Sequence, residues 1–141
     1  MGLQIPHRIG ASPIHGRGLF SLARLEPGAL LWRFEPGSDR ALALAGLPAR
    51  QRLALLHYGY TNPRRPGWVV VCGDAARFWN FPAPGDPANS VLSARTAHGE
   101  QLVIAARWIE PGEELLIEPA SDADYGRKLV HLLARPARQH R

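Results

Sequence analysis

Two short segments of the 141-residue chain hold residue types that could bind or transform a ligand. In the first, glycines flank one arginine (Gly16-Arg17-Gly18), and such a pair lets the backbone turn sharply and approach a ligand closely. In the second, Asn80 lies among aromatic residues, where its side-chain amide can both donate and accept hydrogen bonds. An amide in that setting either bonds the backbone or fixes a ligand.

Two further segments are weaker candidates. The acidic residues of 110–119, taken alone, indicate a solvated strand face. The aromatic group around Tyr58 and Tyr60 has a spacing that is more typical of a core than of a substrate channel. Asn89, which follows Asp86-Pro87-Ala88, is interpreted as a turn residue.

The elements that must position these residues are short. Thirteen prolines and fourteen glycines interrupt the chain every few residues, a pattern typical of short strands joined by turns. Pro-Gly pairs predict type II turns at Pro27-Gly28, Pro36-Gly37 and Pro111-Gly112. The segments 23–28 and 106–112 resemble each other and suggest two similar β units. We expect strands at 29–34, 68–72, 101–106 and 114–117.

Two helices complete the expected fold. Ala49, Leu53, Leu56 and Tyr60 fall on one face of a helix between Pro48 and Tyr60. A second helix is predicted from about 122 to 135, with Pro136 ending it. The fold class is therefore mostly β, with several short sheets, a short central helical insertion and a C-terminal helix. We expect one domain over 1–135 and a basic tail over 136–141.

Composition limits the class of protein. Hydrophobic residues make up 45% and charged residues 21%, which excludes disorder of the whole chain. The longest apolar run, 68–72, is far shorter than the roughly 20 residues of a membrane span. No secretory signal is visible, and the single cysteine, Cys72, excludes an internal disulfide or a cysteine-built zinc site. We expect a cytoplasmic protein without metal.

The charge balance is basic. Seventeen Lys and Arg residues oppose twelve Asp and Glu residues, and Lys128 is the only lysine. A basic surface favours acidic partners, nucleic acid included, although a coding bias toward arginine explains the same count. No aromatic residue interleaves with the basic tail, so nucleic acid is not the partner that we predict.

Taken in order, the segments resemble the SET domain, the fold of many protein-lysine methyltransferases, over most of the chain from about Ile5 to Tyr125. The family's N-terminal Gly-x-Gly motif, followed by an apolar residue, is matched by residues 16–20, GRGLF. Its middle motif, Asp-Ala then Arg-Phe-x-Asn-His-Ser-Cys-x-Pro-Asn, is matched in its first half by residues 74–80, DAARFWN. Its last motif, Pro-Gly-Glu-Glu-Leu, is matched by residues 111–115.

The sequence departs from the family pattern at three places. Phe81 stands where the family has histidine, and the longer, proline-rich segment 82–89 replaces Ser-Cys-x-Pro-Asn. Glu118-Pro119 stands where the family has Asp-Tyr, so the tyrosine usually assigned to catalysis is missing there. The zinc-binding cysteines that follow many SET domains are also absent, as in small stand-alone bacterial members.

The resemblance implies a β-clip SET fold and an enzyme, an S-adenosylmethionine-dependent methyltransferase acting on a lysine side chain of a protein substrate. It implies Tyr58 and Tyr60 as catalytic candidates, with Tyr125 as a third source of a hydroxyl. The alternatives are a catalytically degenerate SET domain that serves as a binding module, and a basic interaction module. The cofactor-binding residues that the resemblance implies are Gly16, Arg17, Gly18, Arg77, Phe78, Asn80 and Phe81.

The chemistry sets one structural requirement. A lysine amine attacks only when neutral, yet its pKa in free solution is about 10.4. A narrow apolar channel and the cofactor's positive charge both disfavour the ammonium form, and orientation supplies much of the remaining rate. The hypothesis also requires the segments around Gly16 and Asn80 to lie side by side, so that together they form the cofactor site.

Overall fold

The computed structural model describes residues 1–123 and 125–126, apart from the side chain of Tyr58. Within that part of the chain the strands form three small antiparallel sheets. The first pairs β1 (His7–Ala11) with β2 (Arg17–Ser21). The second has the order β3-β7-β6, with β3 at Leu30–Trp32, β7 at Glu100–Ala105 and β6 at Ser90–Ala97. The third pairs β4 (Arg40–Ala43) with β5 (Trp68–Val71).

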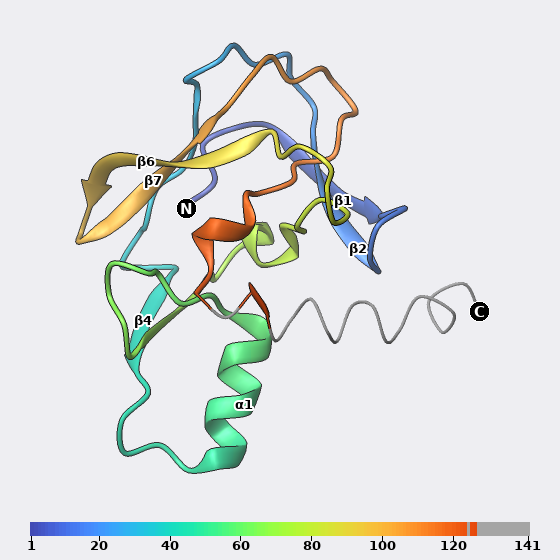
Figure 1. Cartoon of the computed structure of the whole chain (residues 1–141). Coiled ribbons are helices and arrows are strands. Elements are labelled where there is room, and N and C mark those ends of the chain that lie inside the picture. Colours follow the sequence, from blue (N-terminus) through green and yellow to red (C-terminus); the bar gives the residue numbers. More distant parts are fainter. Residues whose placement is uncertain (124, 127–141) are drawn as a thin grey trace.

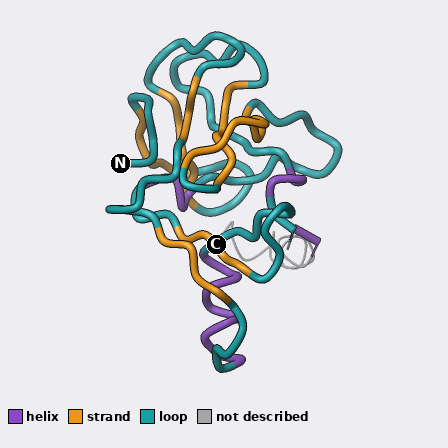
Figure 2. Tube along the Cα trace, turned by 90° about the vertical axis from the view of Figure 1, so that its left-hand side faces the viewer, coloured by secondary structure: helices purple, strands orange, loops and turns teal. Residues whose placement is uncertain are grey.

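The helical elements are few and short. The helix α1 spans Ala49–Tyr58, and two 3₁₀ turns, η1 and η2, span Ala75–Phe78 and Pro119–Ser121. Figures 1 and 2 show α1, together with β4, extending away from the other two sheets. The predicted mostly β fold with a central helical insertion is confirmed. None of the helices described is long and apolar enough to cross a membrane.

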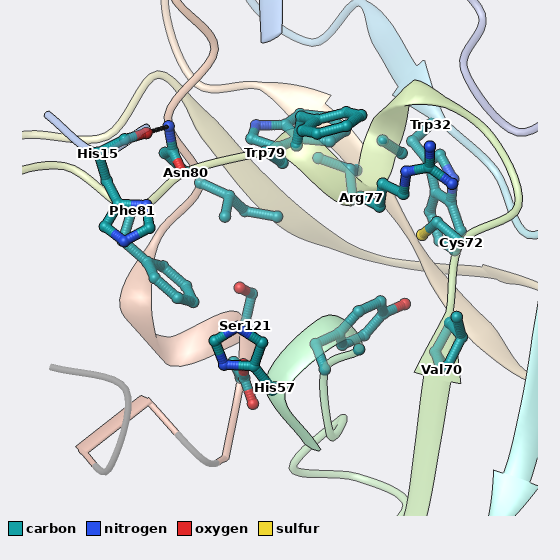
Figure 3. A pocket seen from close by; sticks show the side chains of 18 of the residues that line it. His15, Trp32, His57, Val70, Cys72, Arg77, Trp79, Asn80, Phe81 and Ser121 are labelled. Atoms are coloured by element: carbon teal, nitrogen blue, oxygen red, sulfur yellow. Dashed lines mark hydrogen bonds between the residues drawn. The ribbon is translucent and has the colours of Figure 1, made fainter. Parts of the chain in front are cut away.

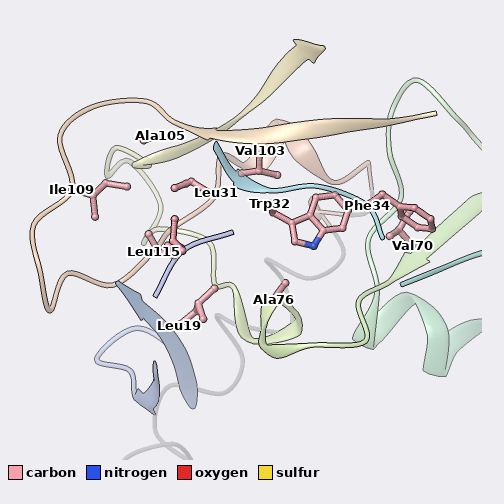
Figure 4. Close-up of a cluster of buried hydrophobic side chains, with 11 residues drawn as sticks. Leu19, Leu31, Trp32, Phe34, Val70, Ala76, Val103, Ala105, Ile109 and Leu115 are labelled. Atoms are coloured by element: carbon pink, nitrogen blue, oxygen red, sulfur yellow. The ribbon is translucent and has the colours of Figure 1, made fainter. Parts of the chain in front are cut away.

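The hydrophobic core joins the sheets to the segments between them. Leu19 of β2, Leu31 of β3, Ile109 and Leu115 are completely buried, and Trp32 is 2% exposed (Figure 4). Each such side chain contributes about 2 kcal/mol on leaving water. Because these residues come from separate elements, the core holds both motif regions against the same centre.

The Pro-Gly turns follow the prediction at two of three places. Gly28 and Gly112 both have a φ of +87°, the left-handed conformation that a type II turn needs at its third residue. Gly37 is not among the glycines with positive φ, so the prediction there is wrong. The N–H of Asp39 donates to the carbonyl of Glu35 at 2.7 Å, which makes this turn a single helical one.

The two similar segments pair with each other. Leu25 and Ile109 exchange two backbone hydrogen bonds of 2.8 and 2.9 Å in an antiparallel bridge. The segments 23–28 and 106–112 thus lie face to face, and they do not head two separate β units.

The expected strand at 114–117 is wrong as a strand. Its residues are extended, but they bridge three different neighbours: Glu114 pairs with Phe20, Leu116 with Asn80 and Ile117 with Ser90. No single partner strand runs beside the segment, because it passes between parts of the chain that come from both motif regions. The strands β1, β2, β4 and β6 were not predicted.

The helix α1 lacks the expected apolar stripe. Leu53 is 57% exposed, and Tyr60 lies beyond the end of the helix, where it pairs with Val70. Residues 49–54 are all exposed because the helix projects from the body of the protein. Of the predicted helix 122–135, residues 122 and 123 are not helical and 125–126 are; residue 124, residues 127–135 and the tail 136–141 lie outside the described residues.

Candidate functional site

A cavity of about 900 Å³ lies where the insertion β4-α1-β5 meets the motif segments (Figure 3). Its wall is mostly aromatic and aliphatic. It includes six of the predicted cofactor-binding residues and one predicted catalytic residue: Gly16, Arg17, Arg77, Phe78, Asn80, Phe81 and Tyr60. Gly18 is not part of the wall, and the side chain of Tyr58 lies outside the described part of the structure. The roles of these residues stay predictions.

The amide of Asn80 holds the glycine loop in place. Its Nδ2 lies 3.0 Å from the carbonyl oxygens of His15 and Arg17 and 3.0 Å from Oε2 of Glu114. An amide carries two N–H protons, so three acceptors share them. Figure 3 shows the bond to His15 at the edge of the cavity. The structure thus places the loop around Gly16 beside Asn80, as the hypothesis requires.

The carboxylate of Glu114 supports that loop from beneath. Glu114 is only 9% exposed, and Oε1 accepts a hydrogen bond from Ser12 Oγ at 2.9 Å. A Cβ on Gly18 would collide with the same carboxylate, whereas one on Gly16 would meet open space. The interpretation of Glu114 as part of a solvated face is therefore wrong, because two side-chain donors compensate its burial.

The two glycines are thus required for different reasons. Gly16 has a φ of +48°, which favours glycine, and it keeps the backbone bare toward the cavity. Gly18 makes room for the carboxylate on which the loop rests.

Asn89 is a buried structural residue that sequence reasoning missed. It is 1% exposed, and its Nδ2 donates to the carbonyl of Glu114 at 2.8 Å and to Oε2 of Glu113 at 3.0 Å. Its Oδ1 accepts from the N–H of Leu116 at 2.8 Å and from Ser90 Oγ at 2.9 Å. The interpretation as a turn residue is wrong. The available signal was the asparagine that also ends the family's middle motif.

The segment 114–118 passes between the two asparagines. The N–H of Ile117 donates to the carbonyl of Asn80 at 3.0 Å, and the N–H of Asn89 donates to the carbonyl of Leu116 at 3.0 Å. Parallel bridges join the segment to both sides. The segment 114–118 therefore packs against Asn80, the same residue that holds the glycine loop.

Tyr60 belongs to the wall of the cavity. Burial raises its pKa well above the ordinary value of 10.0, and four neighbouring groups raise it further: Cys72, Glu100, Asp39 and Asp122. A phenol in this position stays protonated at neutral pH. It can donate or accept a hydrogen bond, but it is not a base. Its ring packs edge-on against Trp32, with the ring centroids 6.3 Å apart.

A tyrosine from further along the chain, Tyr125, lies near the place where the motif tyrosine is missing. Pro119 begins η2, and the following Ser121 and Asp122 line the cavity. The ring of Tyr125 stands edge-on against Phe81, which is in the wall, with centroids 4.8 Å apart. Tyr125 is thus placed next to the cavity by the residue that replaces the family's histidine.

The segment after η2 is tied to the insertion. Asp122 Oδ1 accepts from the backbone N–H of Thr61 at 3.1 Å and from its hydroxyl at 3.2 Å. The N–H of Ala123 donates to the carbonyl of Thr61 at 2.7 Å. These bonds close one side of the cavity beside Tyr60.

Two groups in the wall, the Cys72 thiol and the Trp79 indole, are unlike reactive catalytic groups. Burial raises the pKa of the Cys72 thiol, and the carboxylates of Asp39 and Asp74 raise it further, so the thiol stays protonated. The indole N–H of Trp79 is buried without a hydrogen-bond partner. In the described part of the chain, no three His, Cys, Asp or Glu side chains lie together as metal ligands would.

No protein-family model matches the sequence, and no curated protein is significantly similar to it. Solved structures do match. A putative histone methyltransferase of Plasmodium falciparum superposes with a TM-score of 0.59 at 18% identity, over 82% of this chain and 94% of that one.

Two structures of Polycomb Repressive Complex 2 from Chaetomium thermophilum also match. A humanized mutant bound to an inhibitor has a TM-score of 0.62 at 18% identity, over 87% of this chain. An autoinhibited form bound to S-adenosylmethionine has a TM-score of 0.60 at 19% identity, over 90%. The chain spans only 16% and 17% of those two proteins. The SET-like fold predicted from the motifs is confirmed.

Proposed function

We propose that the protein is a methyltransferase that uses S-adenosylmethionine to methylate a lysine side chain of a protein substrate. One observation carries the proposal: Asn80 binds the carbonyls on both sides of Gly16, across a separation of more than sixty residues, at the edge of a large apolar cavity. The fold shared with methyltransferases supports it, and one of the similar structures is bound to S-adenosylmethionine.

The residues present fit this cofactor. Gly16 leaves the loop backbone bare toward the cavity, and the aromatic wall suits an adenine ring. Because Nδ2 of Asn80 is bonded to the loop, its Oδ1 is the atom that would accept a hydrogen bond from the ammonium of the cofactor's amino-acid end. The cofactor-binding set is then Gly16, Arg17, Arg77, Phe78, Asn80 and Phe81, with Gly18 acting through Glu114.

When bound, S-adenosylmethionine would supply an electrophilic methyl group to the lone pair of the amine, and the electrons of the broken C–S bond would stay on its sulfur. The chain has three tasks around that event. Its apolar wall, with Trp32 and Val103, favours the neutral amine, whose proton leaves to water before attack. The hydroxyl of Tyr60, kept protonated by its buried position, orients the amine. The segment at Ser121 and Asp122, bonded to Thr61, shields the amine from solvent on one side of the cavity.

The first experiment is calorimetric titration of the full chain with S-adenosylmethionine and S-adenosylhomocysteine, followed by transfer of a labelled methyl group to lysine-containing peptides. We expect saturable binding of both and label on lysine. Absence of binding to the folded protein would overturn the proposal.

The catalytic hydroxyl is tested separately with three variants, Tyr58→Phe, Tyr60→Phe and Tyr125→Phe. We expect Tyr60→Phe to lower kcat with little change in cofactor affinity. If all three variants keep the wild-type turnover, no tyrosine hydroxyl takes part and that element of the mechanism is wrong.

A degenerate SET domain that only binds is the second candidate function. Pro119 in place of the motif tyrosine and Phe81 in place of histidine favour it. Cofactor binding without methyl transfer to any peptide would support this candidate over the enzyme. A cytoplasmic location and a bacterial type stay predictions from the sequence.

A further inference from the structure

We propose that the substrate lysine is presented in an acidic segment of polypeptide, and that a basic tail is a poor substrate. This inference rests on the proposed methyl transfer and names the class of protein that enters the site. Its basis is the positive charge around the cavity, to which three separate elements contribute.

Two exposed arginines line the cavity, and a third lies on the adjoining face of α1. Arg17 at the start of β2 and Arg77 of η1 are part of its wall. Arg50 lies four residues before Ala54, which is also in the wall, so the two positions share a face of α1. None of the three arginines forms an ion pair with any residue that the structure describes.

Little negative charge is available in the wall to neutralise them. The acidic side chain there is Asp122, which is 3% exposed and accepts hydrogen bonds from Thr61. The whole sequence carries a formal net charge of +5, so the surroundings add to the local field. A concave site lined by one sign of charge attracts ligands of the opposite sign.

The same field has a chemical consequence for the substrate. Positive charge around an apolar cavity disfavours the ammonium form of an arriving lysine and so favours the neutral amine that must attack. It also repels a peptide whose other residues are basic. Acidic flanks remove that repulsion for the segment and leave the amine itself in the positive field.

The test compares two fluorescent peptides with one central lysine and identical neutral spacers, flanked either by four glutamates or by four arginines. Binding is measured by anisotropy with the full chain and S-adenosylhomocysteine, and methylation by mass spectrometry. At low salt we expect the acidic peptide to bind at least about tenfold more tightly, since each exposed charge pair contributes up to about fivefold. The preference should shrink as added salt shortens the Debye length.

Two arginine variants separate a local effect from net charge. Arg50→Gln should lower the preference for the acidic peptide about threefold. Arg24→Gln removes the same charge at a residue outside the cavity wall, where Arg24 pairs with Glu110 and stacks on Trp108, and it should leave the preference unchanged.

Equal binding of the two peptides, tighter binding of the basic one, or an equal effect of the two variants would overturn the inference. Displacement of the acidic peptide by duplex DNA at equal charge concentration would also overturn it, in favour of a general polyanion site. Anisotropy measures peptide binding without any turnover. If the protein binds no cofactor and transfers no labelled methyl group, the proposed function is refuted, and the anisotropy data still decide the peptide preference separately.

Discussion

Replacing Asn80 by aspartate tests the central contact of the site with almost no change in volume. The substitution exchanges the Nδ2 donor for a second oxygen that faces two carbonyls and the carboxylate of Glu114. Losing two hydrogen bonds costs about 2 kcal/mol of folding free energy. Repulsion from Glu114 at this partly exposed position adds about 1 kcal/mol. The expected loss is therefore about 3 kcal/mol, a large share of a typical stability of about 5–15 kcal/mol.

The assay combines urea denaturation with calorimetric titration of S-adenosylhomocysteine under conditions where the variant is folded. Because the loop around Gly16 loses its anchor, we expect the cofactor Kd to rise at least about tenfold, or about 1.4 kcal/mol. The matched control is Asn62→Asp, which places the same new carboxylate near Glu100 at a buried residue outside the cavity wall.

The control should lose stability and keep the wild-type affinity for the cofactor. If the folded Asn80 variant binds the cofactor as tightly as the wild type, the loop is not the binding element. If Asn62→Asp weakens binding to the same degree, the effect is a general consequence of lower stability.

Three further substitutions follow from the structure. Gly18→Ala drives a methyl group into the carboxylate of Glu114 and should lower the free energy of unfolding by about 2 kcal/mol in urea titrations, with wild-type stability as the contrary result. Arg65→Met removes the ion-pair partner of Glu100, which is 1% exposed, and should cost about 3 kcal/mol by the same measurement; a cost below about 0.5 kcal/mol would show that water replaces the guanidinium. The raised pKa of Tyr60 means that the unfolded chain releases this proton first, so wild-type stability should fall as pH rises above 10.0. Tyr60→Phe should flatten that fall in alkaline denaturation curves, and an unchanged slope would contradict the assigned burial.

The sequence predicted those parts of the fold in which a local pattern decides the structure. The apolar run 68–72 became β5, which ends at Val71, and the Pro-Gly pairs at Gly28 and Gly112 became type II turns. Both depend on neighbouring residues alone. The prediction at Gly37 was wrong because the N–H of Asp39 also donates to the carbonyl of Glu35, and no local sequence pattern reveals that bond.

The parts that could not be predicted depend on contacts between distant residues. Glu114 and Asn89 are residue types that are common on surfaces and in turns. Both are nevertheless buried, because donors and acceptors from other segments form hydrogen bonds with their side chains. The family motifs indicated which segments meet. They did not indicate that Tyr125 would stand against Phe81, since the family has histidine at the place of Phe81.

The bond between Ser12 and Glu114 joins residues 102 positions apart and has a consequence for biosynthesis. A nascent chain that has emerged only as far as Asn80 already contains the glycine loop, but it lacks the carboxylate of Glu114 on which the loop and Asn80 rest. Long-range closures of this kind slow folding, because a large loop must be ordered before any contact compensates for it. In the proposed function, cofactor binding therefore has to wait until Glu114 has left the ribosome.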